Sequence, residues 1–289
     1  KINAVSVAAS AAAGVGGSAG IAVSGAGTES TNIILGSTQA HIENSIVFSA
    51  ADINIDASDS SQIHASVIAA SLAVGVGGST GVGASIGVSV ARNLIGYSID
   101  DSGFGYETTD TGVTQITQGE KVKIDIGVKS GNIYKYIGST TLKYVDENGN
   151  ATNAVIDLEE MDYSDSDLWE LVNLDDSKAK SIHAYSLGSS LSAAGDISID
   201  ANSTQSIDAL VIAASAAFSG GGSVGVGLSG AGVNTENFIQ ASIKAYISGD
   251  GATGISAESI TVNAIDISSI RADAAAASIA ASFAGAAAV

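Results

Sequence analysis

Two short segments of the sequence carry oxygen-bearing side chains at every second position. They are DINIDA at 52–57 and DISIDA at 196–201, and a third segment, SITVNA at 259–264, repeats the pattern with fewer carboxylates. Every second side chain of a β-strand lies on one face, and Ca²⁺ takes carboxylate and amide oxygens as ligands. If these strands stack directly, their oxygens could form a ladder that binds structural calcium. The candidate ligands are Asp52, Asn54, Asp56, Asp196 and Asp200.

Four aromatic residues occur together in an acidic part of the sequence. Tyr134 and Tyr136 are two positions apart and share a strand face, and Tyr163 and Trp169 follow within DYSDSDLW. Their rings could form a platform on which a surface glycan stacks. The alternative is that they form the core of a small domain that is short of other large apolar side chains.

No catalytic motif is recognisable, and we expect that the protein is not an enzyme. Its three histidines, His41, His64 and His183, occur in similar strand-like contexts, whereas nucleophilic catalysis needs a base beside an activated serine. The GVGGS segments lack the following Lys and the helix of a phosphate-binding loop. A β-helical enzyme that degrades polysaccharides is a less favoured alternative, because basic residues are too sparse in the repeats to line a groove for acidic sugars.

The element that organises these segments is an uncharged stretch within 63–95, in which larger apolar residues alternate with Gly, Ala and Ser. A period of two is typical of β-strands and not of helices, which argues against a membrane-spanning helix. The face that carries the small residues is smooth enough to approach another layer closely. We therefore expect it to be buried as an assembly face, against another layer of the same chain or against a neighbouring subunit. Its residues include Ser71, Gly75, Gly77, Ser79, Gly81, Gly83 and Ser85.

This stretch recurs along the chain at offsets of 61, 144 and 63 residues, and Asn32, Asn93 and Asn237 fall in register. Self-similarity at a fixed period is the signature of stacked arrays. We predict an all-β fold, a parallel β-solenoid (β-helix) built from repeats of about 61–63 residues. Each repeat is expected to make two or three coils of about 20 residues, with Val and Ile inside. The absence of Pro fits central strands.

The composition narrows the possible partners. The chain of 289 residues has 30 acidic and 11 basic residues and no Cys. Such an acidic chain is not expected to bind nucleic acid or anionic membranes, and a secreted or cell-surface (extracellular) location fits it. The sequence starts at Lys1 and stops within a repeat at Val289, so we expect it to be part of a longer protein.

An inserted segment interrupts the second repeat. We divide the chain into solenoid repeats at 1–98, an inserted β-rich domain at 99–181 and further solenoid repeats at 182–289. The insertion contains strand-like GEKVKIDIG at 119–127 and a hairpin pattern with Asn148-Gly149 at its turn.

The combination of GEKVKID, YKYIG, IDL and DYSDSDLW resembles a module found between the Ala/Gly/Ser-rich β-repeats of giant bacterial surface exoproteins, similar to leukotoxin-type filamentous adhesins. The resemblance implies a β-helical stalk, secretion and a surface role, and it supplies no catalytic residues. We expect a structural segment that self-associates into fibres or lateral assemblies, as part of a stalk, filament or sheath with a role in adhesion. A glycan-binding module carried by the insertion is the alternative.

Overall fold

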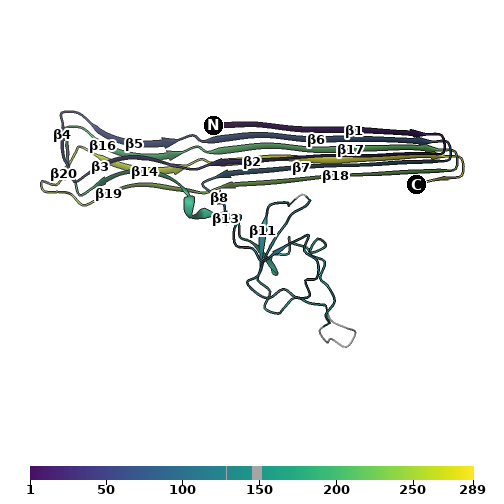
Figure 1. Ribbon diagram of the computed structural model, residues 1–289. Helices are drawn as coiled ribbons and strands as arrows, with labels where there is room; N and C mark the ends of the chain where they lie inside the picture. The colour runs from purple at the N-terminus through teal and green to yellow at the C-terminus, as the bar shows by residue number, and fades with distance from the viewer. Residues whose placement is uncertain (128, 145–151) are drawn as a thin grey trace.

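The computed structural model describes residues 1–127, 129–144 and 152–289. It is nearly all β, and its long strands stack in parallel into a solenoid, beside which lies a small inserted domain (Figure 1). The predicted fold class, an all-β parallel β-solenoid, is confirmed. The predicted turn at Asn148-Gly149 lies outside the described residues.

One coil of the solenoid consists of two long strands followed by three short ones. The first coil contains β1 (Ile2–Gly16), β2 (Ala19–Ile34), β3 (Ser37–Glu43), β4 (Ile46–Ser49) and β5 (Ile53–Asp59). The second contains β6 (Gln62–Gly77), β7 (Thr80–Ile95), β14 (Lys180–Leu187), β15 (Ser190–Ala193) and β16 (Ile197–Ser203). The third contains β17 (Ser206–Gly221), β18 (Val224–Ile239), β19 (Ala241–Ser248), β20 (Ile255–Ser256) and β21 (Ile260–Asp266). A fourth begins with β22 (Ser269–Ala284) and β23 (Ala287–Ala288).

Each sequence repeat therefore makes one wide coil, and the expectation of two or three coils per repeat is wrong. The reason is the length of the strands, since β6 and β7 have 16 residues each. The path out and back along these two strands uses about half of the repeat before the three short strands close the coil.

The strands pair with the register that the repeat offsets predict. Ile2 pairs with Ile63, Ile63 with Ile207, and Ile207 with Ile270. The neighbouring coils thus place like residues above like, and the backbone hydrogen bonds run along the solenoid axis. This register holds even where the insertion separates the second coil from its own short strands.

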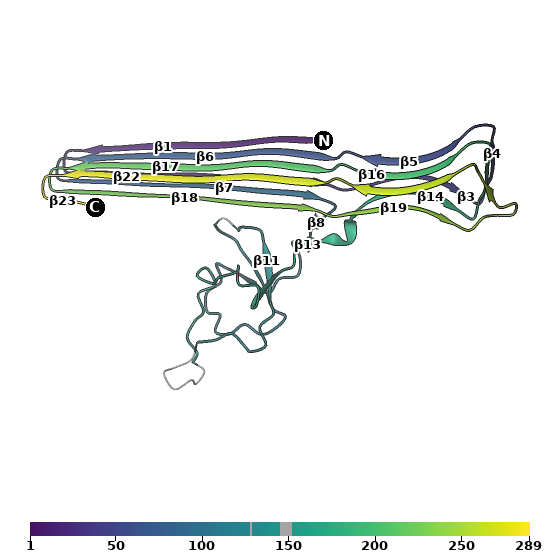
Figure 2. The ribbon, with the colours of Figure 1, turned by 180° about the vertical axis from the view of Figure 1, so that it is seen from behind.

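The two long strands of a coil belong to different sheets. One sheet has the order β1-β6-β17-β22 and the other β2-β7-β18-β23, so β6 and β7 face each other across the interior and do not form a hairpin. Figures 1 and 2 show the two sheets as a long flat blade with the turns at one end. The turn between β6 and β7 consists of Gly78 and Ser79.

The interior of the blade narrows from its base to its turns. At the base, Ile63 and Ile95 pack with Ile207 and Ala65 in an apolar cluster. Nearer the turns the inward positions are Ala, Ser and then Gly, because side chains alternate along each strand and the small set faces inward. The expected burial of Val and Ile inside is therefore correct at the base and wrong along most of the blade.

Beyond the base, the three short strands enclose a wider apolar core. Its fully buried members include Ile182, Leu191, Ile197 and Ile199. Here the coil follows the ordinary rule that large aliphatic side chains point inward. Sheets of three strands each, β19-β14-β3, β20-β15-β4 and β21-β16-β5, form the walls of this part.

The inserted domain leaves the solenoid after β7 and returns to it at β14. It contains β8 (Ser98–Ile99), β9 (Tyr106–Glu107), β10 (Lys121–Lys123), β11 (Ile133–Tyr136), β12 (Trp169–Leu171), β13 (Leu174–Asp175) and the 3-10 helix η1 (Asp176–Lys178). β8 pairs with β13, which brings the two ends of the insertion together, and a small sheet has the order β12-β11-β10-β9. This geometry explains how so long a segment fits into one corner of a coil without disturbing the stacking.

Candidate functional site

The small-residue face that the sequence singles out lies inside the blade. Ser71 and Ser85 are 6% and 1% exposed, and the glycines between them and the turn also point inward. An ideal Cβ on Gly75 would lie 1.9 Å from the carbonyl oxygen of Val82, on the facing strand. Only Ser79, at the turn, is exposed. Of the two alternatives for this face, the structure shows packing against another layer of the same chain, which leaves it closed to a neighbouring subunit.

Two columns of polar side chains run through the interior. Asn32 donates to Asn93 and Asn93 donates to Asn237, both at 2.8 Å, which links three coils. Across the interior, the hydroxyl oxygens of Ser71 and Ser85 are 2.6 Å apart. Because these polar groups hydrogen-bond each other, their burial carries no penalty for unpaired donors.

The larger apolar side chains point away from the interior into solvent on both faces. We call the outward side chains of β1, β6, β17 and β22 face A, and those of β2, β7 and β18 face B. The exposed apolar residues of face A include Val5, Val7, Val15, Leu72, Val76, Leu210, Phe218, Ile279 and Phe283. Those of face B include Ile21, Val23, Ile86 and Leu228. Monomeric proteins rarely expose contiguous apolar surface of this extent.

A row of polar side chains bounds face A at its base. Pairing in register brings Asn3, His64, Asp208 and Arg271 side by side across the four strands. His64 Nδ1 lies 3.7 Å from Asp208, and Arg271 forms an ion pair of 2.9 Å with Asp273. In the next row Asp273 lies beside Leu210, Ser66 and Val5, and from there to the turns face A carries no further charge.

The candidate calcium ligands stack as the sequence predicts, but their oxygens are engaged by neighbouring donors. Asp56 pairs in register with Asp200, whose carboxylate accepts a hydrogen bond of 2.8 Å from the amide of Asn263. The Asp52 carboxylate accepts from the backbone N–H of Asp196 at 2.9 Å. Asn54 is exposed beside them. Within the described residues, no three His, Cys, Asp or Glu side chains gather into a group that could hold a metal ion.

The four aromatic residues proposed as a glycan platform form the core of the inserted domain. Tyr136 and Trp169 pack edge to face with ring centroids 5.2 Å apart, and Tyr163 lies 4.8 Å from Trp169. Tyr134 joins them, and all four are at most 8% exposed. Burial raises the pKa of the Tyr163 hydroxyl, which donates to the carbonyl oxygen of Leu158. Rings that are covered on both sides offer no face to a sugar.

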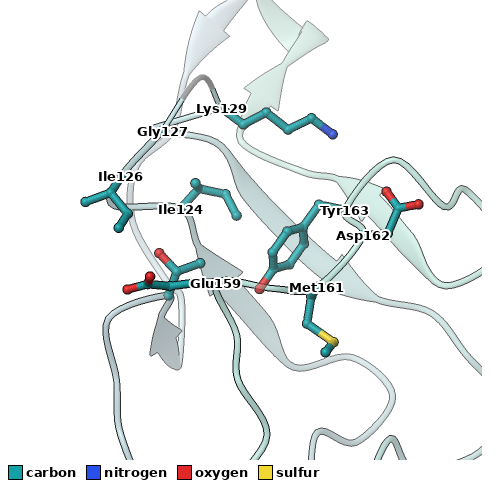
Figure 3. Close-up of a pocket in the computed structure, with 9 residues that line it drawn as sticks. Ile124, Ile126, Gly127, Lys129, Glu159, Met161, Asp162 and Tyr163 are labelled. Atoms are coloured by element: carbon teal, nitrogen blue, oxygen red, sulfur yellow. The ribbon is translucent and has the colours of Figure 1, made fainter. Parts of the chain in front are cut away.

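A hollow of about 380 Å³ opens beside this core (Figure 3). Ile124, Met161 and Tyr163 line its floor, and Lys129 and Asp162 lie at its rim. The carboxylate of Glu159 lies on the opposite side of the hollow from Asp162 (Figure 3). Among the described residues, the two carboxylates of the hollow therefore lie apart, and Lys129 lies on the side of Asp162 (Figure 3).

A buried polar cluster joins the inserted domain to face B. Arg92 of β7 forms an ion pair of 3.1 Å with Glu236 on the neighbouring strand β18, and both side chains are largely buried. The Arg92 guanidinium also donates to the carbonyl oxygen of Ser130, and the amide of Asn132 donates to Glu236. Two outward side chains of the solenoid thus hold two residues of the insertion.

Sequence reasoning missed this cluster and one further feature. On β3, β14 and β19, the rings of His41, Tyr185 and Tyr246 stack with centroid separations of 5.0 and 4.9 Å. The repeat offset of 144 residues connects Arg92 with Glu236 and His41 with Tyr185, so the signal was present in the alignment of repeats. It becomes informative only once strand pairing is known to follow that offset.

No model of a protein family, curated protein or solved structure matches this chain. Among the described residues, no helix is long and apolar enough to cross a membrane. Fold and surfaces together define a parallel β-solenoid that carries an inserted β domain.

Proposed function

We propose that this chain is a structural segment of a large secreted or cell-surface protein, in which it forms part of a stalk, filament or sheath with a role in adhesion or cell-surface assembly. The observation that carries the proposal is the exposed apolar surface on both faces of a rigid blade. A monomeric protein in water rarely exposes so large an apolar surface, whereas a component of an assembly uses such a surface to contact its neighbours.

The function is mechanical. Parallel strands in register place the ladder hydrogen bonds of the coils along the solenoid axis, so a pulling force along that axis is shared among the ladders of the five sheets of the solenoid. Solenoids of this kind gain stability from contacts between neighbouring coils, and the column from Asn32 to Asn237 adds side-chain hydrogen bonds in the same direction. The resemblance of the inserted segment to a module of giant surface exoproteins supports the same role.

The experiment is sedimentation velocity of the purified chain over a range of concentrations, followed by electron microscopy of the same samples. We expect association that increases with concentration and elongated particles of regular width. A chain that stays monomeric at every concentration, including hundreds of micromolar, would overturn the proposal.

A further inference from the structure

The two faces of the blade differ in how freely they can meet a partner. On face B, the outward side chains of Val90, Arg92 and Leu94 are buried, and Arg92 contacts Ser130 of the inserted domain. Figure 1 shows the inserted domain on the side of the blade formed by β2, β7 and β18. Another flat surface cannot lie along the whole of face B while the inserted domain projects from it. No described part of the chain projects from face A in this way (Figure 1).

The size of face A suits a dimer. Four strands spaced about 4.8 Å apart, with outward apolar residues over about ten positions of about 3.3 Å each, give roughly 600 Å² per copy. Two copies packed face to face would bury about 1,200 Å², which reaches the lower end of specific interfaces. A small soluble partner would cover only part of this surface, whereas a second blade matches it in length, width and flatness.

The pattern of charge and side-chain size selects one arrangement of two copies. A twofold axis parallel to the strands, between β6 and β17, places β6 of one copy over β17 of the other. His64 of one copy then lies opposite Asp208 of the other, and Leu72 of one copy lies opposite Ala216 of the other. The imidazole of His64 meets the carboxylate of Asp208 at the base, and a large side chain meets a small one nearer the turns.

An axis perpendicular to the strands gives a worse match. It would place the row of His64 and Asp208 against the apolar end of the second copy, where Asp208 and Arg271 would lose their contact with water. The parallel axis keeps both polar rows together at one end, at the rim of the interface.

We infer that face A is an isologous interface with a second copy of this chain, related by a twofold axis that runs parallel to the strands. The inference rests on the proposed function and specifies the surface and geometry through which the self-association begins. Face B, which carries the inserted domain, then remains on the outside of the pair, where that domain is free to contact the surroundings.

The test of the surface compares two matched substitutions in the whole chain by sedimentation equilibrium. Leu72→Asp alters face A and Ile86→Asp alters face B, at positions that are 39% and 59% exposed, so neither removes a core contact. We expect wild type and Ile86→Asp to form dimers and Leu72→Asp to have a Kd raised at least about 100-fold. Circular dichroism spectra and melting curves establish that each variant is folded.

The test of the geometry uses Val5 of β1, which is 76% exposed. Strand pairing places Val5 and Asp273 in the same row across the four strands, at its two ends. A parallel axis places Val5 opposite Asp273 of the second copy. Val5→Asp is then expected to weaken the dimer by at least tenfold more than Val5→Lys, whose ammonium meets a carboxylate. An equal effect of the two substitutions would overturn the parallel axis. Because Val5 lies on an exposed edge, these variants also report on face A if Leu72→Asp does not fold.

The outcomes separate this inference from the proposed function. Dimers that are disrupted by Ile86→Asp and retained by Leu72→Asp would overturn the assignment to face A and leave self-association intact. A wild-type chain that remains monomeric would overturn both, and so would a monomeric chain that instead floats with phosphatidylcholine vesicles.

Discussion

The hydroxyl oxygens of Ser71 and Ser85 lie 2.6 Å apart across the interior of the blade. The same contact recurs at 2.6 Å between Ser10 and Ser24 in the coil before. Two stacked sheets are ordinarily about 10 Å apart, because side chains of Val or Leu size fill the space between them. A direct bond between two serines requires a much smaller separation. The Val and Leu side chains of these strands must therefore point outward.

The close approach of the sheets predicts which glycines are indispensable. Gly75→Ala would place a methyl group 1.9 Å from the backbone oxygen of Val82, and backbone cannot move aside as a flexible side chain can. We expect the free energy of unfolding to fall by about 3 kcal/mol, at the upper end of the usual cost of overpacking. Urea denaturation followed by circular dichroism measures it.

The matched control is Gly25→Ala, at a glycine of β2 that faces outward with nothing within 4 Å of an added Cβ. This substitution should be neutral or stabilise by up to about 0.5 kcal/mol, because it reduces the entropy of the unfolded chain. Equal effects of the two substitutions would show that the sheets are not in close contact at Gly75.

The column of asparagines predicts that removing a single side-chain amide lowers the free energy of unfolding strongly. Asn93 is fully buried and bonds to both Asn32 and Asn237, so Asn93→Ala leaves buried polar groups without a partner on two coils. We expect a loss of about 2–3 kcal/mol in the free energy of unfolding. The exposed Asn54 provides the comparison, and Asn54→Ala should change stability by less than about 0.5 kcal/mol. A loss of similar size at both positions would argue against the column.

The docking of the inserted domain depends on Arg92. Arg92→Lys keeps the charge, but one ammonium cannot reproduce both the Glu236 pair and the bond to Ser130 that the guanidinium makes. We expect faster amide hydrogen exchange in 129–132 and earlier protease cleavage near 96–100, with the melting of the solenoid strands little changed. Lys135→Arg serves as the control, since Lys135 pairs with Glu170 at the surface, where ion pairs contribute little. Unchanged exchange in Arg92→Lys would mean that other contacts hold the domain.

Acid should weaken the solenoid at a second buried ion pair. Asp59 and Lys180 are 3.0 Å apart and nearly buried. Burial by itself raises the pKa of Asp59, but the hydrogen bonds from Lys180 and Ser61 outweigh it and hold this pKa below the ordinary value of 3.8. A depressed pKa means that the stabilisation is present above pH 3.8 and is lost as the pH falls through the lower, folded-state value.

The measurement is the melting temperature between pH 6 and pH 2 for wild type and Asp59→Asn. The asparagine variant should be less stable at pH 6 and should show a shallower fall below pH 4. Parallel curves for the two proteins would contradict the assignment to Asp59.

The repeat offsets were sufficient to predict the strand register, because parallel coils of equal length place equivalent residues side by side, as with Asn32 and Asn93. They were not sufficient to predict the shape of the coil. The turn at Gly78 and Ser79 is compatible with a hairpin or with two facing layers, and only the spacing of the layers distinguishes them. The usual rule that Val76 should point inward fails because Gly75 and Gly77 permit backbone contact between the sheets.

The same distinction applies to the candidate sites: the strand register predicts which residues are neighbours, but not what their side chains contact. That Asp56 and Asp200 stack follows from the register, but the engagement of the Asp200 carboxylate by Asn263 depends on side-chain geometry. Tyr134 and Trp169 are far apart in sequence, and whether they form a surface or a core depends on how the inserted domain folds around them. The Arg92 and Glu236 pair required knowledge that strands on either side of the insertion are neighbours.

Small side chains fill the blade and large ones cover it, and the absence of native Cys allows a direct test of this packing. Single substitutions Ser71→Cys and Leu72→Cys place a thiol on adjacent residues of β6 that point in opposite directions. At concentrations below the onset of self-association, a maleimide should label the Leu72→Cys protein within minutes and the Ser71→Cys protein only after denaturation. Rapid labelling at position 71 with protection at position 72 would contradict the inverted packing and, with it, the account of the outer faces as the surface of assembly.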